Sequence, residues 1–311
     1  MQFPFQLNND REFDVVGFGT NAVDYLIEVP NYPSFNSKTE LNKYTRAAGG
    51  EVATTMVGLQ RLGLRTAYIG RFGDDQAGSF GLKTLTDEGV NVAHAEQVRG
   101  AGTQIAFIII DARNGERTVI WKRDEKLWYR EEEAPVDVVS HSSVLHLTPH
   151  DAKAATAMAR AAKASGTIVS TDVDNVFEGI EDLLPLVDIL IASAEFPARL
   201  LGITDHRTAL PEMSQRYGSK ICGVTLGSAG SLLFWDGEFI DTPAFEVPGG
   251  CRDTTGAGDA YRVGIIYGLI KGSSIEEAAR YANAVAALKC RAIGARTSLP
   301  QTEELLEFLQ R

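Results

Sequence analysis

Short apolar runs alternate along most of the chain with stretches whose apolar positions recur at helical spacing. The runs are bounded by polar or turn-forming residues, so they predict buried strands at 14–18, 66–69, 143–147, 167–170, 188–191 and 221–225. The helical stretches lie between them, at 51–62, 76–88, 152–164 and 206–216. Strand–helix alternation of this kind predicts an α/β fold in which helices cover both faces of a mainly parallel central sheet.

Two segments depart from this alternation. Residues 21–44 are polar, contain Pro30 and Pro33, and lack a helical period. Residues 104–123 hold two β-rich runs around Asn114-Gly115, and Asn-Gly is a strong signal for a hairpin turn. We expect both segments to form strands of a small sheet that projects from the main body. The sequence has no internal repeat or long linker, so we interpret residues 1–311 as a single domain.

Composition narrows the possible partners. The chain has 311 residues, of which 44% are hydrophobic, which is enough for a large core. Its formal net charge of -11 disfavours binding to nucleic acid or to an anionic membrane. The three cysteines, Cys222, Cys251 and Cys290, form no C-x-x-C pair and suggest free thiols in a reducing compartment. With no basic, apolar leader and no long apolar stretch, we expect a cytoplasmic protein.

The most informative chemical signal is the string from Asp253 to Asp259, which reads Asp-Thr-Thr-Gly-Ala-Gly-Asp and precedes an apolar run. Small residues at 256, 257 and 258 let the backbone approach a ligand, and the start of the following helix presents free N–H groups to it. Asp259 in the first turn would reach the same space and take a proton from a hydroxyl while the N–H groups hold phosphate charge. The structural alternative is that Asp253 or Asp259 caps the helix and the glycines form a tight turn.

This string resembles the carboxy-terminal signature of the ribokinase-like (PfkB) carbohydrate kinases. The family's amino-terminal signature is similar to Gly49-Gly50-Glu51-Val52-Ala53-Thr54 with the later Leu62-Gly63, and to the run from Gly70 to Gly78. The resemblance implies a ribokinase-like three-layer sandwich with a β-sheet lid. It also implies ATP-dependent phosphorylation of a hydroxyl on a sugar or sugar-like molecule. In that reaction Asp259 is the general base, and Gly256, Ala257 and Gly258 form the anion hole.

Substrate contacts follow from the same resemblance. Asp24 matches the family's early substrate-holding aspartate, and Gly49 and Gly50 match the glycine pair that lets the sugar approach the backbone. Many members carry Asn where this chain has Thr54, so one expected substrate hydrogen bond is altered. The structural alternatives are an ordinary strand residue for Asp24 and a helix-entry turn for the glycines.

Nucleotide and magnesium contacts are implied in the second half of the chain. The loop from Thr225 to Gly230 resembles the family's Thr-x-Gly-x-x-Gly nucleotide loop, and the helix after the signature contributes to the adenine pocket. The residues concerned are Thr225, Gly227, Gly230 and Asn283. Ser193 stands where the family has Asn, and Glu195 is the candidate to orient magnesium-bound water. The structural alternatives are a plain hairpin for the loop, a solvated helix face for Asn283 and a first-turn helix acid for Glu195.

A monovalent cation is a further implication of the resemblance. In the family, the first aspartate and second threonine of the signature ligate potassium together with carbonyls of a late loop. The corresponding residues here are Asp253, Thr255, Lys289, Ala292, Gly294 and Ser298. Lys289, Ala292 and Gly294 would contribute only backbone oxygens, and a set of oxygen ligands suits a hard cation.

Other site patterns are disfavoured by their context. Gly17-Phe18-Gly19-Thr20-Asn21-Ala22 fits a Rossmann dinucleotide string, which would indicate an oxidoreductase. That string needs a helix directly after it, but residues 23–30 alternate and end in proline, as in a strand. No P-loop string occurs. His146 and His150 have helical metal-binding spacing, but Pro149 between them denies that geometry.

Several functional alternatives remain open at this level. A catalytically inactive sugar-binding regulator on the same fold would be expected to lack the base or the glycines, and both are present. Resembling kinases act on sugars, sugar acids, sugar phosphates and nucleosides, so a nucleoside kinase is an alternative. Arg71, Lys122 and Arg123 lie in pocket-proximal stretches and would suit an acidic or phosphorylated substrate, unless they are simply solvated. In resembling kinases the lid often pairs two subunits, which suggests a homodimer.

Overall fold

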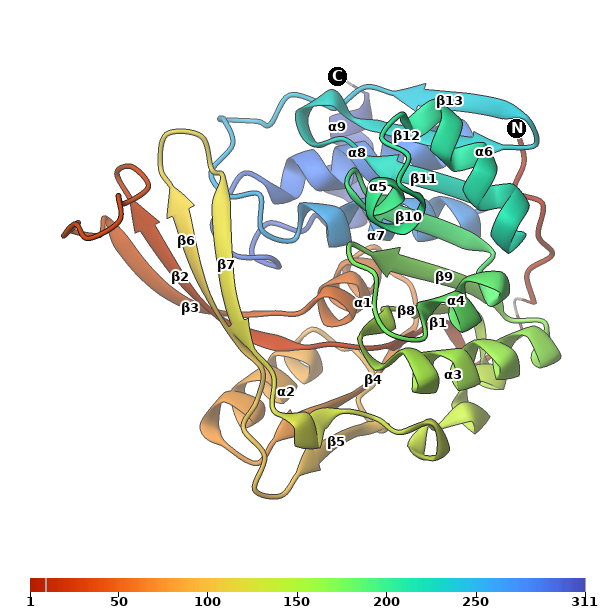
Figure 1. The fold of residues 1–311 in the computed structure, drawn as a ribbon, viewed down its shortest axis with the longest axis horizontal. Helices are drawn as coiled ribbons and strands as arrows, with labels where there is room; N and C mark the ends of the chain where they lie inside the picture. The colour runs from red at the N-terminus through yellow and green to blue at the C-terminus, as the bar shows by residue number, and fades with distance from the viewer. Residues whose placement is uncertain (9, 311) are drawn as a thin grey trace.

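The computed structural model describes residues 1–8 and 10–310, and a nine-stranded sheet forms the centre of this part of the chain (Figure 1). The strand order is β13-β12-β11-β10-β9-β8-β1-β4-β5. The strands from β11 to β5 are parallel, whereas β12 and β13 form an antiparallel hairpin at one edge. Their bounds are β1 Phe13–Phe18, β4 Thr66–Gly73, β5 Ala95–Val98, β8 Ser142–Leu147, β9 Ile168–Val173, β10 Ile189–Ser193, β11 Ile221–Thr225, β12 Ser231–Trp235 and β13 Glu238–Thr242.

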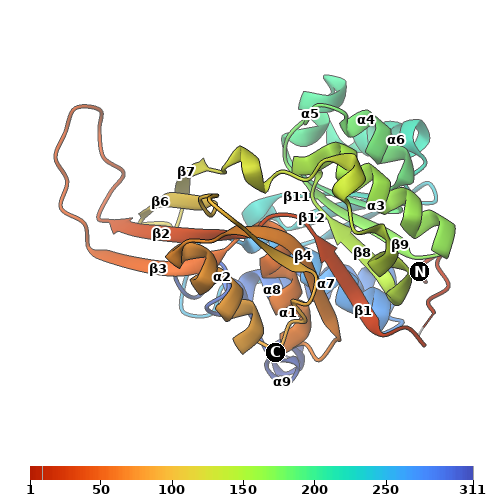
Figure 2. The same ribbon diagram turned by 90° about the horizontal axis from the view of Figure 1, so that it is seen from below.

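Helices cover both faces of this sheet and give three layers (Figure 2). They are α1 Glu51–Arg61, α2 Gln76–Asp87, α3 Ala152–Ser165, α4 Ile180–Leu183, α5 Phe196–Leu201, α6 His206–Tyr217, α7 Ala257–Ile270, α8 Ile275–Lys289 and α9 Thr302–Leu309. Side chains of α1, α7, α8 and α9 build the core on one face, and those of α3, α4 and α6 build it on the other. Every residue of β8 and β9 is buried, as expected for parallel strands between two helical layers. The predicted α/β class is confirmed.

The remaining helical segments are single 3-10 turns or slightly longer. They span Glu125–Leu127, Glu131–Glu133, Val136–His141, Pro149–Asp151, Leu184–Leu186 and Gly227–Ala229. Among the described residues, the longest helix is α8 with 15 residues, and each helix is too short or too polar to span a lipid bilayer.

A second, four-stranded sheet projects from the main body and is called the lid here (Figure 1). Its order is β3-β2-β6-β7, with bounds β2 Ala22–Val29, β3 Lys43–Gly49, β6 Ile105–Asp111 and β7 Arg117–Lys122. The Asn114-Gly115 hairpin between β6 and β7 is confirmed. The stretch after the Rossmann-like string is strand β2, as its alternation predicts.

The first lid segment differs from the expected range of 21–44. Residues 30–42 form a loop that extends beyond the lid in Figure 2, and the second strand continues to Gly49. Pro30 and Pro33 lack backbone N–H groups, so the chain leaves the ladder there and resumes pairing at Lys43.

The lid hairpin rests on the segment that precedes α7. The N–H of Thr254 donates to Gly115 O at 3.2 Å, and Arg117 Nη1 donates to Thr254 Oγ1 at 2.9 Å. A Cβ on Gly115 would stand 3.1 Å from the carbonyl carbon of Arg252, so glycine permits this close approach. The structure therefore has the lid lying against the start of α7.

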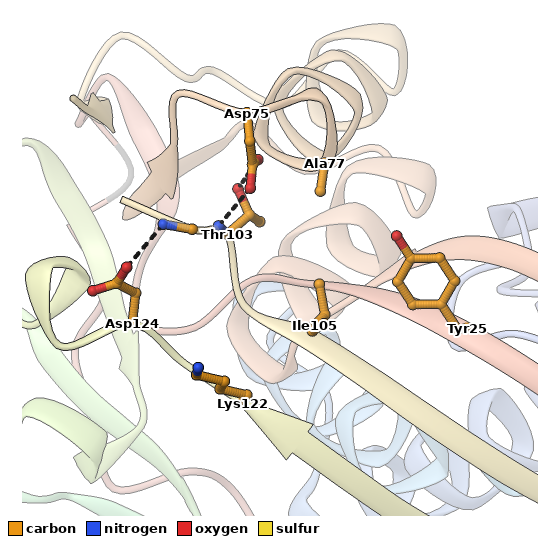
Figure 3. Close-up of a pocket in the computed structure, with 8 residues that line it drawn as sticks. Tyr25, Asp75, Ala77, Thr103, Ile105, Lys122 and Asp124 are labelled. Atoms are coloured by element: carbon orange, nitrogen blue, oxygen red, sulfur yellow. Dashed lines mark hydrogen bonds between the residues drawn. The ribbon is translucent and has the colours of Figure 1, made fainter. Parts of the chain in front are cut away.

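The outer face of the lid borders a small pocket of about 360 Å³ next to the start of α2 (Figure 3). Asp75 caps α2 and accepts hydrogen bonds from Gly78 N at 2.7 Å and Thr103 N at 3.0 Å. Asp124 accepts from Gly102 N at 2.9 Å. Both carboxylates are thus engaged by backbone N–H groups, and Asp75 joins the segment that leads into β6 to the start of α2.

Candidate active site

A cleft of about 1170 Å³ lies between the carboxyl ends of the parallel strands and the inner face of the lid. Ligand sites of open α/β sheets lie at this edge. The cleft brings together residues that the sequence singles out from six separate segments. These are Asp24, Gly50, Ser193, Thr225, Gly227, Gly230, Thr255, Gly256, Ala257, Gly258, Asp259 and Asn283.

The start of α7 forms part of the cleft wall. Gly256 is its N-cap and has φ 78°, and a Cβ there would stand 2.9 Å from the Cβ of Ala295. The N–H of Ala257 donates to Thr254 O at 3.1 Å, so it differs from the expected free donor. The N–H groups of Gly258 and Asp259 have no acceptor within the described residues. This first turn therefore offers two open donors and the positive end of a helix dipole.

The carboxyl group of Asp259 faces that of Asp172, the penultimate residue of β9. Burial raises the pKa of Asp259 to about 8, and the negative charge of Asp172 adds to the rise. Arg262, one turn further along α7, is only 3% exposed; its Nη2 lies 2.6 Å from Asp172 Oδ1 and donates to Ile191 O at 3.0 Å. Burial also raises the pKa of Asp172, and the Arg262 guanidinium opposes that rise.

Glu51, in the first turn of α1, adds another carboxyl group to the same end of the cleft. Its Oε2 accepts from Thr20 Oγ1 at 3.3 Å and lies 3.4 Å from His150 Nδ1. Burial raises the pKa of Glu51 well above its usual value, and Asp172, Asp174 and Asp259 reinforce the rise. Burial lowers the pKa of His150 to about 4, so His150 is neutral at pH 7.

The carboxylate of Asp24, on β2, packs against the glycine pair Gly49–Gly50. A Cβ on Gly49 would overlap the Asp24 carboxylate, and one on Gly50, at φ 88°, would overlap the backbone of Asn21. Both glycines are therefore required for this packing. Burial raises the pKa of Asp24 to about 6, and Arg296 opposes the rise.

Thr54 does not line the cleft. It is fully buried, and its Oγ1 accepts from Arg296 Nε at 3.4 Å. Arg296 also donates to Gly49 O, so it supports the glycine pair from behind. Thr54 therefore has a structural role in place of the expected substrate contact, because its side chain is engaged by Arg296.

Glycines shape the opposite half of the cleft. Gly227 has φ 58° and Gly230 has φ 97°, and a Cβ on Gly230 would overlap the carbonyl oxygen of Thr242. Thr225 ends β11 beside them. Asn283 lines the same half, but its Nδ2 donates to Ser231 Oγ at 3.0 Å and Thr242 O at 3.3 Å. The amide of Asn283 is thus held in the protein rather than solvated on a helix face.

The two candidate magnesium residues separate in space. Ser193 ends β10, lines the cleft, and has its Oγ 3.5 Å from Asp174 O. Glu195 is exposed at the N-cap of α5 and is absent from the cleft wall. Asp174 and Asn175, directly after β9, line the cleft close to Ser193, so the acidic residue beside Ser193 in the cleft wall is Asp174 and not Glu195.

The candidate cation residues surround Asp253, which is completely buried. Asp253 Oδ1 accepts from Thr255 N and Oδ2 from Gly294 N, each at 2.8 Å. Lys289 is also completely buried, and its Nζ donates to Asp253 O at 2.6 Å. The carbonyl of Lys289 accepts from Ser298 Oγ at 2.5 Å. Lys289 therefore acts through its side chain, and the expectation that it offers only a backbone oxygen is wrong.

The three basic residues considered for an acidic substrate lie outside the cleft. Arg71 pairs with Glu96 at 2.9 Å, and Arg123 pairs with Asp151 at 2.7 Å. Lys122 points into the pocket on the outer side of the lid (Figure 3). None of them is placed to contact a ligand in the cleft.

Sequence reasoning missed Asp172, Arg262 and Glu51. Asp172 carried a usable signal, because it lies two residues after the predicted parallel strand 167–170 and the ends of such strands gather at one sheet edge. Arg262 lies three residues after Asp259, which places both on one helix face. Glu51 sits inside the amino-terminal signature itself.

Three comparisons with known proteins bear on this site. The profile of the pfkB family carbohydrate kinase matches residues 14–302. The nucleoside kinase of Methanothermobacter thermautotrophicus is 26% identical over 309 residues, which cover 97% of this chain and 96% of that protein. The ribokinase of Haemophilus influenzae is 27% identical over 301 residues, with 94% and 97% covered. The structure of Arabidopsis thaliana ribokinase with ribose and ATP superposes with a TM-score of 0.81 at 25% identity, covering 96% of this chain and 99% of that one.

The Asp172–Asp259 contact predicts an unusual titration. In carbon-13 NMR of the free protein, the carboxyl carbon of Asp259 should titrate near pH 8. In Asp172→Asn the midpoint should fall, because the like charge is gone and Arg262 is left facing Asp259. Asp87→Asn, an exposed change on α2, should leave the midpoint in place. A midpoint near the usual value of about 4 in the unaltered protein would contradict this account.

Proposed function

The chain belongs to the pfkB family carbohydrate kinases and phosphorylates a sugar-like substrate with ATP, and we propose that Asp259 is the general base of this transfer. Family membership confirms the resemblance that the two signatures carry. The observation that most supports our proposal is that Asp259 and the open N–H groups of Gly258 and Asp259 line one cleft. Phosphoryl transfer to a hydroxyl requires a carboxylate next to an anion-binding helix N-terminus.

In the proposed reaction, Asp259 in its ionised form accepts the proton of the acceptor hydroxyl. The acceptor oxygen bonds to the γ-phosphorus, the bond from that phosphorus to the β–γ bridging oxygen breaks, and ADP leaves with the electron pair. The N–H groups of Gly258 and Asp259 hold the charge on the transferred group, supported by the dipole of α7. The closed lid excludes water, which limits the hydrolysis of ATP.

ATP, as its magnesium complex, would occupy the half of the cleft that contains Thr225, Gly227 and Gly230. Phe245 and Ala286 give that half an apolar wall suited to the adenine ring. Ser193 and Asp174 are the best-placed groups to bind metal-held water. They follow β10 and β9, which lie next to β11 and its Thr225 in the sheet order. We assign the protein to the cytoplasm, where ATP is supplied and its three free cysteines stay reduced.

The acceptor is proposed to be uncharged. Five carboxyl groups line the acceptor half, from Asp24, Glu51, Asp172, Asp174 and Asp259. The cations beside them are Arg117, which bonds Thr254, Arg262, which pairs with Asp172, and the buried Arg296, which bonds Thr54 and Gly49. A carboxylate or phosphate on the acceptor would meet this acidic surface without a free partner. A neutral sugar, held through a hydroxyl by Asp24, fits the charges best.

A nucleoside is the second candidate acceptor, and three aromatic residues favour it. The ring of His150 lies 4.7 Å from that of Phe177 and 6.3 Å from that of Trp121. All three line the cleft near Glu51, and Trp121 on β7 is 55% exposed. Such a surface suits a flat heterocyclic ring attached to a sugar.

The lid is proposed to be a mobile part of one kinase domain and also a dimer contact. Its outer face carries Tyr25, Tyr44, Phe107 and Ile120, and Tyr25 stacks on Phe107 with ring centres 5.1 Å apart. Tyr44, Phe107 and Ile120 are 54%, 44% and 57% exposed. A contiguous apolar face of this kind indicates a protein contact.

Asp259→Asn tests the proposed base. The variant should lose about 10²- to 10⁴-fold in kcat, because the amide cannot accept the proton. ATP binding, followed by calorimetry, should persist because Gly258 and Asn at 259 keep their N–H groups. Asp87→Asn serves as the matched control and should keep full activity. Unreduced turnover in Asp259→Asn would end the assignment.

A panel of acceptors tests the proposed substrate charge. Coupled ADP release should be seen with neutral sugars or nucleosides and should be absent with sugar acids and sugar phosphates. If nucleosides react, Trp121→Ala and Phe177→Ala should raise their KM by about two- to tenfold with little change for free sugars. Turnover confined to a phosphorylated or carboxylated sugar would contradict the uncharged acceptor while leaving the kinase assignment intact.

Light scattering after gel filtration tests the dimer. The unaltered protein should have twice the chain mass of 33.7 kDa. Phe107→Glu should give the single-chain mass, because it places a charge in the apolar lid face. Leu306→Glu, an equally exposed change on α9, should leave the mass unchanged. A monomer at micromolar concentration without any substitution would reject the contact.

A further inference from the structure

The family resemblance implies a monovalent cation next to the start of α7, but the residues found there do not fit one. We propose that the ammonium group of Lys289 replaces that cation, so that this kinase works without potassium. The kinetic part of this inference rests on the proposed function, and its structural part does not.

Lys289 is the last residue of α8, and its side chain turns into the protein with no exposed surface. Its Nζ donates to Asp253 O at 2.6 Å and lies 3.9 Å from Asp253 Oδ2. Asp253 is the residue that begins the signature leading to Gly256 and Asp259. An ammonium group carried by the chain itself is thus already hydrogen-bonded to one of the residues expected to ligate the cation.

Two of the expected ligands, the Asp253 carboxylate and the Lys289 carbonyl, are engaged within the protein. Both carboxylate oxygens of Asp253 accept backbone N–H groups, from Thr255 and Gly294, at 2.8 Å. The carbonyl of Lys289 accepts from Ser298 Oγ at 2.5 Å. Thr255 Oγ1 is buried and has no partner within the described residues, so it is one remaining oxygen. The carbonyl oxygens of Ala292 and Gly294 also accept no hydrogen bond within the described residues, but a hard cation placed among these oxygens would lie beside the fixed ammonium group of Lys289, which repels it.

The local charges also favour a built-in cation. Asp253 Oδ2 lies 3.9 Å from the Lys289 ammonium nitrogen. The other titratable groups that act on it are Cys251, Cys290 and Arg117, and only Arg117 is a cation. An unpaired buried charge is strongly unfavourable, so Asp253 and Lys289 each require the other. The C-terminal end of α8 further stabilises a positive group at residue 289.

This arrangement gives Lys289 a positioning role. Its ammonium group binds the backbone of Asp253, and Asp253 in turn binds the N–H of Thr255, directly before the N-cap Gly256. Lys289 thereby fixes the turn that presents the N–H groups of Gly258 and Asp259. A potassium-dependent kinase of this family would have to bind an ion from solution to fix the same turn.

Potassium titrations of the unaltered protein, Lys289→Ala and Lys289→Met test the proposal. Melting temperature and ADP release are both measured as potassium rises from none to about 0.1 M, with tetramethylammonium keeping the ionic strength constant. The unaltered protein should show no shift in melting temperature and less than about a twofold change in rate. Lys289→Ala, which leaves room for an ion, should be at least about tenfold slower without potassium and should be stabilised and reactivated by it.

The controls separate charge from packing. Lys289→Met keeps the side-chain volume without the charge, so it should be slow and should recover much less with potassium than Lys289→Ala. Lys271→Ala, an exposed lysine change at the end of α7, should behave like the unaltered protein. A large activation or a rise in melting temperature of the unaltered protein by potassium would overturn the proposal. Failure of every acceptor to release ADP would overturn the proposed function instead, and the melting temperatures would still decide the role of Lys289.

Discussion

The contact between two carboxyl groups at the floor of the cleft is the constraint on which the site depends. Asp172 arrives from the end of β9 and Asp259 from the first turn of α7, and the Arg262 guanidinium compensates for only one negative charge. One of the two carboxyl groups therefore holds a proton over much of the neutral range. The proposed base becomes active only when that proton leaves or when a bound cation or substrate shifts the balance.

The fold makes this contact possible by bringing backbone segments unusually close together. Gly256 turns the chain against Ala295, and the Gly49–Gly50 pair admits the Asp24 carboxylate on the other side of the cleft. The lid hairpin then bonds Thr254 through Gly115 and Arg117, so the same short segment connects lid, anion-binding turn and base. Movement of the lid would thus shift the start of α7 directly, through these hydrogen bonds.

Local patterns in the sequence predicted most of the fold and the backbone of the site. Helices α1, α2, α3 and α6 begin at the expected residues, and the glycine-rich turn precedes a helix as its composition requires. Side-chain pairing between distant segments was not predictable in the same way. Arg296 engages Thr54, the Lys289 ammonium reaches Asp253, and Glu195 turns to solvent while Asp174 faces the cleft. Each of these depends on which strand ends become neighbours, and no local period or capping signal carries that information.

The central claim is that one point in the cleft holds both the transferred phosphoryl group and the base. The most direct measurement is a crystal structure of the complex with ADP, magnesium, aluminium fluoride and an accepted substrate. The account predicts that the fluoride group accepts hydrogen bonds from Gly258 N and Asp259 N, with an acceptor hydroxyl within hydrogen-bond reach of the Asp259 carboxylate. A fluoride group held elsewhere in the cleft, or an Asp259 carboxylate turned away from the acceptor, would contradict it.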